Sequence, residues 1–149
     1  MKKTILFFAV LVIALLFFAG SYQLFKTAPP FAEINNHIFR LEIAKTEKQQ
    51  EIGLAKYKSI PLDFGMLFPF EKEGFYSFWM KNMKFPIDII YIRNSRIVTI
   101  FRDVPYPKSG NEKLPVYQPS SPADTVLEIN ANLSQKYGFK INQPVQIIY

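Results

Sequence analysis

Four side chains that can do chemistry lie close together in the middle of the chain: Trp79, Lys81, Asn82 and Asp88. The single tryptophan offers a flat face on which a ligand can stack, while amide and carboxylate groups can orient a polar ligand such as a sugar or a peptide. A structural interpretation competes, because Asn and Asp side chains commonly hold loops through backbone N–H groups. In that case Lys81 pairs with Asp88. We favour the structural interpretation, since buried polar groups need partners whether or not a ligand binds.

A second carboxyl, Glu128, stands inside an apolar stretch that has the pattern of a strand. Strand alternation can turn this side chain toward solvent. If it points inward instead, it can form a buried ion pair with Lys81 or Arg102. Alternatively it acts beside Asp88 as one of two carboxylates, the arrangement that hydrolyses a glycosidic bond. The sequence does not fix the separation of the two groups.

Other kinds of catalytic and metal chemistry find little support. The chain has no cysteine, which removes thiol catalysis, disulfides and thiolate metal sites. His37 is the only histidine, so neither a zinc site nor a Ser-His-Asp triad is favoured. The six glycines are scattered and form no phosphate-binding loop. We therefore expect neither a metal nor a cofactor.

A proline-rich stretch over residues 105–122 predicts a long ordered loop, and loops of this kind often carry function. It contains Tyr106 and Tyr117, which could form a rigid lip over a ligand-binding cleft. We favour the alternative in which these tyrosines pack against the body of the domain. The phenylalanines between residues 68 and 85 are expected to lie mostly in the core, namely Phe68, Phe70, Phe75, Phe78 and Phe85.

The N-terminus predicts export. Lys2 and Lys3 precede 15 uncharged residues from Ile5 to Ala19, the pattern of a secretory signal peptide. Extended to Phe25, the apolar run reaches 21 residues, the length of a signal anchor that spans a membrane. Residues 1–25 are thus a signal peptide or a signal anchor, and residues 26–31 a linker. The protein is then periplasmic or extracellular, or tethered to the cytoplasmic membrane by residues 5–25.

The remaining residues, 32–149, have the length of one globular domain. Without Lys2 and Lys3 the chain has 16 basic and 12 acidic residues, a net charge of +4. The basic residues are spread along the sequence. A nucleic-acid partner would require a concentrated basic stripe, so none is expected.

The periodicity of the domain predicts a β-rich α+β fold. We expect a curved sheet or partly closed small barrel of about six or seven short strands with two short helices. The predicted strands cover 37–44, 65–70, 75–81, 87–93, 96–104, 125–129 and 145–149, and the helices 47–56 and 131–137.

Three local signals support individual elements. Thr46 and Gln49 have the spacing of a capping box at a helix start. The pair Asn94-Ser95 between two apolar runs predicts a hairpin turn. Pro69 has no N–H to donate, which places it at a sheet edge or a bulge.

The sequence also resembles a known family. The following segments occur in the family's order and approximate spacing: Leu41-Glu42-Ile43-Ala44, Gly53-Leu54, Gly65-Met66-Leu67-Phe68, Phe78-Trp79-Met80-Lys81-Asn82, Pro86-Ile87-Asp88 and Val126-Leu127-Glu128. They are similar to domain of unknown function 192, small bacterial and archaeal proteins that often carry an export leader. The resemblance covers about residues 38–149. It implies a compact β-rich fold and no established activity.

These observations predict a non-catalytic binding or interaction module of the cell envelope. Its shallow cleft would lie near the Trp-Met-Lys-Asn segment and the Tyr/Pro loop, with a glycan or a peptide as ligand. A small cofactor-free hydrolase using Asp88 and Glu128 is one alternative. A structural partner of another envelope protein, bound by strand addition near Pro69, is the other.

Overall fold

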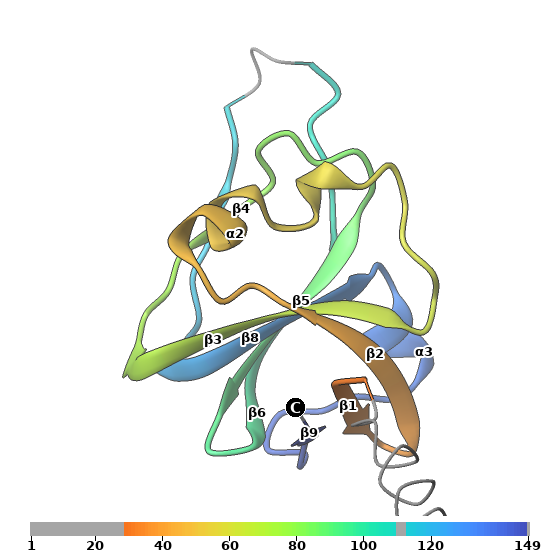
Figure 1. Ribbon diagram of the computed structural model, residues 1–149, viewed down its shortest axis with the longest axis vertical. Coiled ribbons are helices and arrows are strands. Elements are labelled where there is room, and N and C mark those ends of the chain that lie inside the picture. The colour runs from red at the N-terminus through yellow and green to blue at the C-terminus, as the bar shows by residue number, and fades with distance from the viewer. Residues whose placement is uncertain (1–28, 110–112, 149) are drawn as a thin grey trace, which may run out of the picture.

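A computed structural model describes residues 29–109 and 113–148, so the predicted leader lies outside the described residues. The chain forms a strongly curled sheet of seven strands in the order β6-β5-β8-β3-β2-β1-β9, with a separate pair β4-β7 (Figure 1). The strands are β1 (Phe31–Ile34), β2 (His37–Ile43), β3 (Phe64–Gly74), β4 (Phe78–Trp79), β5 (Ile87–Arg93), β6 (Arg96–Val104), β7 (Val116–Tyr117), β8 (Ala123–Asn130) and β9 (Gln146–Ile148). This architecture, with two short α-helices, confirms the predicted fold class.

The sheet buries apolar side chains on both of its faces. Successive residues of a strand point to opposite faces, so one strand can feed two cores. On β8, Val126 belongs to one cluster and Leu127 to the other. On β5, Ile89 and Ile90 divide in the same way. The sequences of β5 and β8 are therefore nearly continuous apolar runs, and few polar residues occur within them.

The helical segment covers the predicted residues 47–56, but only its first part is α-helical. Helix α2 (Glu47–Ile52) is followed by the 3-10 turn η1 (Gly53–Lys56), and the break falls at Gly53. Gly53 has φ 51° and ψ −143°, a conformation that residues with a side chain rarely adopt. It redirects the chain after α2 and ends the helix earlier than the predicted residue 56.

The start of α2 confirms the predicted capping box. The Thr46 hydroxyl accepts a hydrogen bond from the Gln49 N–H at 3.2 Å, and the Gln49 side chain accepts one from the Thr46 N–H at 3.0 Å. Thr46→Ala is expected to lower the free energy of unfolding by about 1 kcal/mol, because it leaves a helix N–H without its partner.

Urea denaturation can measure this effect, with Thr46→Ser as the matched control because serine keeps the hydroxyl. Equal loss of stability in both variants would show that the methyl group matters rather than the cap.

Pro69 lies at an irregularity, as predicted. The register between β3 and β8 shifts between Pro69 and Gly74. Strand β2 pairs with β3 only as far as Leu67, so the next part of β3 is free on that side. The Gln50 side chain of α2 donates to the carbonyl oxygen of Pro69 at 3.3 Å and to that of Ala44 at 3.2 Å. Helix α2 is thereby fixed beside the exposed part of β3.

Several predicted boundaries were wrong in detail. The predicted strand 75–81 reduces to the two residues of β4, which pair with β7 inside the proline-rich loop. Helix α3 (Leu133–Lys136) is only one turn long, and it begins after Asn132 rather than Asn130. Asn130 instead ends β8, where its side-chain amide donates to the carbonyl oxygens of Ile60 and Pro61. Strand β1 was not predicted: it has only four residues and begins inside the predicted linker, although a two-residue turn at Asn35-Asn36 joins it to β2 as a hairpin.

Within the ranges that the structure describes, no helix is long and apolar enough to cross a bilayer.

Candidate functional site

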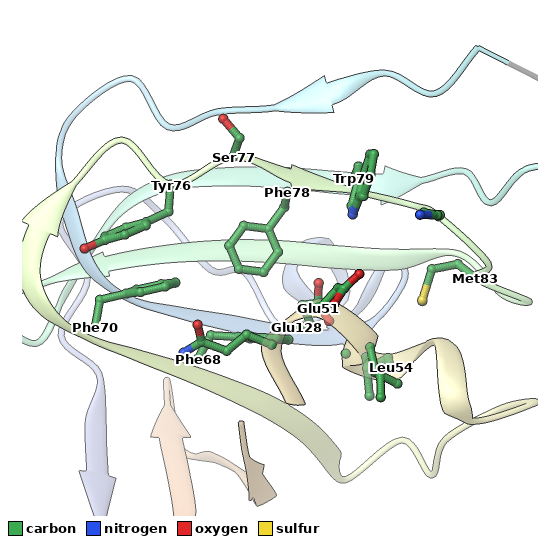
Figure 2. A pocket seen from close by; sticks show the side chains of 14 residues that line it. Glu51, Leu54, Phe68, Phe70, Tyr76, Ser77, Phe78, Trp79, Met83 and Glu128 are labelled. Atoms are coloured by element: carbon green, nitrogen blue, oxygen red, sulfur yellow. The ribbon is translucent and has the colours of Figure 1, made fainter. Parts of the chain in front are cut away.

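A cavity of about 210 Å³ lies between helix α2, the β4 segment and one face of the sheet (Figure 2). We call it the Glu128 cavity. It is lined by Gln50, Glu51, Ile52, Gly53, Leu54, Phe68, Phe70, Tyr76, Ser77, Phe78, Trp79, Lys81, Met83 and Glu128. The lining thus comes from four separate parts of the chain, and their packing gives the cavity its shape.

Aromatic rings form much of the wall. Phe70 and Tyr76 stack face to face, with ring centroids 3.5 Å apart. Phe68 and Phe78 meet edge to face at 5.0 Å. Such ring pairs restrict each other's orientation and contribute beyond the area that they bury. The aromatic wall is therefore largely formed before any ligand arrives.

Glu128 places a carboxyl group among these apolar residues. It stands on β8 between Met66 of β3 and Ile89 of β5, and only 5% of it is exposed. Among residues 29–109 and 113–148 its carboxyl makes no hydrogen bond. Burial raises the pKa of Glu128 to about 8, because a charged carboxylate is poorly solvated there. The group is thus mostly protonated at neutral pH.

Gly53 allows the turn after α2 to approach this carboxyl closely. A β-carbon built on Gly53 would lie 3.9 Å from Glu128 Oε2 and 3.5 Å from the ring of Phe68. Gly53 thus combines a positive φ with close contact to the Glu128 carboxyl. Gly53 therefore shapes one side of the cavity as well as ending the helix.

The rim carries the polar and charged groups. Trp79 is 50% exposed, and the ammonium nitrogen of Lys81 lies 5.0 Å from the centre of its ring, a cation–π contact. Glu51 reaches the same cavity from α2. The predicted residues Trp79 and Lys81 are thus brought together with Glu128.

The carboxylate of Asp88 is bound by backbone N–H groups. Its carboxylate accepts hydrogen bonds from the N–H groups of Asp103 at 2.8 Å, Asn132 at 2.9 Å and Ser134 at 2.8 Å. These bonds join the end of β6 to the start of α3. The ion pair that we predicted between Asp88 and Lys81 is not formed: the carboxylate accepts three backbone N–H groups, and Lys81 lies over an indole ring.

The structure does not bring Asp88 and Glu128 together. In the antiparallel pairing of β5 with β8, Asp88 is opposite Ile129, and Ile89 is opposite Glu128. Directly paired residues project from the same face of a sheet, and adjacent residues from opposite faces. The two carboxyl groups therefore lie on different faces and cannot flank one glycosidic bond.

The other predicted residues lie beside the cavity or away from it. Asn82 adopts φ 61° and lines a neighbouring hollow that it shares with Trp79 and Lys81. The ring of Tyr117 packs edge-on against Phe101 with centroids 5.3 Å apart. Tyr106 is exposed, and neither tyrosine is among the lining residues.

Sequence reasoning missed the contribution of α2 and η1, including Glu51 and Gly53. Of the phenylalanines expected mostly in the core, Phe70 and Phe78 are half-buried against the core cluster and also line the cavity, and the prediction was wrong only for Phe75, which is exposed. One signal was available: a glycine directly after a capped helix indicates that the helix ends and the chain changes direction there. The described part of the chain holds no group of three His, Cys, Asp or Glu side chains able to share a metal ion.

Comparison with models of known protein families gives a match. The model of DUF192, described as "Uncharacterized ACR, COG1430", matches residues 31–147. A crystal structure of a protein of unknown function from Novosphingobium aromaticivorans is 28% identical, with a TM-score of 0.67, covering 80% of this chain and 84% of that one.

A second crystal structure comes from Sinorhizobium meliloti, and its description suggests a transcription regulator. It is 26% identical, with a TM-score of 0.68, covering 79% of this chain and 91% of that one. No match is found among curated proteins.

Proposed function

We propose a ligand-binding function for this chain, which belongs to the family DUF192. In this proposal the domain is a non-catalytic module that receives a small ligand, or a side group of a larger one, in the Glu128 cavity. The ligand stacks against the aromatic wall and meets the carboxyl at the base. If residues 1–25 direct export, the ligand is an envelope component such as a glycan or a peptide.

One observation carries the proposal: the carboxyl of Glu128, a residue only 5% exposed, opens onto a preformed cavity and has no hydrogen-bond partner among the residues that the structure describes. Leaving a buried polar group unpaired is costly, and most such groups in folded proteins have partners. Carboxyls whose pKa is strongly raised by burial in a cleft are found preferentially at functional sites. Trp79 at the rim adds an exposed stacking surface.

The alternatives have less support. Hydrolysis by paired carboxylates requires Asp88 near Glu128, and the pairing of β5 with β8 separates them. Strand addition near Pro69 meets an obstacle, because the Gln50 side chain already donates to the Pro69 carbonyl oxygen. DNA recognition through a helix, as a transcription regulator commonly uses, has no support among the described α-helices, which have six and four residues.

A binding screen with the full chain tests this proposal. Short glycans and peptides are assayed by thermal shift, and hits are quantified by calorimetry. Trp79→Ala is expected to weaken binding up to about tenfold, because it removes a stacking contact worth about 0.5–1.5 kcal/mol. Since Trp79 is half exposed, the variant should remain folded.

Tyr106→Ala is the matched control, an exposed aromatic outside the cavity. It should bind like the native protein. The proposal fails if no compound binds, or if both variants lose affinity equally.

A further inference from the structure

On the basis of the proposed binding function, we propose that the group received by the Glu128 cavity is an organic ammonium ion, a positively charged nitrogen on an alkyl chain. The chemistry of the lining residues supports this ligand class. An ammonium group can contact a carboxylate and aromatic faces at the same time, and this cavity offers both.

The aromatic wall is suited to a cation. The face of an aromatic ring carries partial negative charge, which attracts ammonium groups within about 6 Å of the ring centre. The protein already shows this interaction at the rim, where Lys81 lies over Trp79. The cavity below adds Phe78, Tyr76 and the stacked Phe70 to the surfaces available to a ligand.

The charged and titratable groups around Glu128 favour the same conclusion. Glu51 approaches from α2 and adds a second carboxylate, while Lys81 is occupied over the indole ring. Tyr91 of β5 lies near enough to Glu128 for their charges to interact. Its single O–H, however, is directed to the carbonyl oxygens of Tyr76 and Tyr117, so it does not donate a hydrogen bond to the Glu128 carboxyl.

Binding of a cation must be linked to the ionisation of Glu128. Burial holds the pKa of this carboxyl at about 8, so most molecules carry a neutral acid at pH 7. A cation binds the ionised form and thereby lowers the pKa. If only the ionised form binds, affinity rises about tenfold between pH 7 and pH 9, because the ionised fraction rises from about a tenth to about nine tenths. A neutral ligand shows no such rise.

Two pairs of probes of matched shape test the inference by calorimetry on the full chain. Choline is compared with 3,3-dimethylbutan-1-ol, its neutral analogue, and n-butylamine with n-butanol. We expect at least one cation to bind more tightly than its neutral partner and to gain about tenfold in affinity between pH 7 and pH 9. A response to choline alone would identify a quaternary ammonium ligand, and a response to n-butylamine alone a primary one.

Glu128→Gln keeps the shape of the side chain and removes its ionisation. It should abolish both the preference for the cation and the dependence on pH. Glu51→Gln is the comparison variant: it removes the second carboxylate, at the rim, and should weaken binding less while keeping the pH dependence, because Glu128 is intact. Equal loss in the two variants would place the cation at the rim and overturn the inference.

The probes also separate this inference from the proposed function. If neutral and charged probes bind equally, or only the glycan or peptide screen gives ligands, the ammonium class is wrong and the binding function stands. If neither the probes nor the screen yields a ligand, both fail. The pH dependence is measured on the native protein, so the test does not depend on whether a variant folds.

Discussion

Glu128→Gln is expected to stabilise the protein at alkaline pH. The pKa of Glu128 is raised from 4.5 to about 8 in the folded state, so between these values the folded protein binds the proton more tightly than the unfolded chain. The free energy of unfolding must therefore fall as pH rises from about 5 to about 8. The full difference corresponds to at most about 5 kcal/mol, and glutamine, which does not ionise, escapes this loss.

The prediction is checked by urea unfolding of the native protein and the variant at pH 5, 7 and 9. The difference between the two is the informative quantity, because every other titrating group is shared. It should be small at pH 5 and reach a few kcal/mol in favour of the variant at pH 9. Glu51→Gln, at the exposed rim, should follow the native curve. Parallel curves for Glu128→Gln and the native protein would mean that the carboxyl is better solvated than its burial indicates.

Glu128 illustrates how far the sequence could lead. An acidic residue within an apolar stretch is visible in the sequence, and it was a candidate for that reason. Its direction was not predictable, because alternation identifies an inward face only when one face of a strand is polar. Both faces of β8 are covered by apolar clusters, so the neighbours of Glu128 look alike on either side. Only the register with β3 and β5 places the carboxyl in the cavity.

Features encoded by neighbouring residues were predicted best. The capping box at Thr46 and the hairpin turn at Asn94-Ser95 depend on a few consecutive side chains, and both occur as expected. Strand β7 depends instead on β4, which is distant in sequence, so nothing local distinguishes it from the rest of the loop. The position of α2 in the cavity wall also depends on residues that are distant in sequence. It is fixed by the long-range contact of Gln50 with the Pro69 carbonyl oxygen.

Asp88 was a candidate ligand-binding residue for which we favoured a structural role, and its geometry leads to a prediction about stability. Asp88→Ala is expected to lower the free energy of unfolding by about 4 kcal/mol or more. It would leave the N–H groups of Asp103, Asn132 and Ser134 without their common acceptor, in a place where the carboxylate is inaccessible to solvent. Asp88→Asn should cost about 2–3 kcal/mol, because one carboxylate oxygen becomes an NH₂ donor.

Chemical denaturation of these variants decides between the two roles of Asp88. The matched control is Asp124→Ala, which removes the acceptor of one backbone N–H, that of Asn94 at the exposed hairpin turn, and of the Thr125 hydroxyl, and should cost about 1 kcal/mol. Asp88→Asn, where it remains folded, should bind the ligands of the Glu128 cavity as the native protein does, because Asp88 and Glu128 project from opposite faces of the sheet. A stable Asp88→Asn protein that has lost its ligand would refute the structural role. It would also place the binding site on the other face of the sheet, beside α3, where three backbone N–H groups now meet the carboxylate.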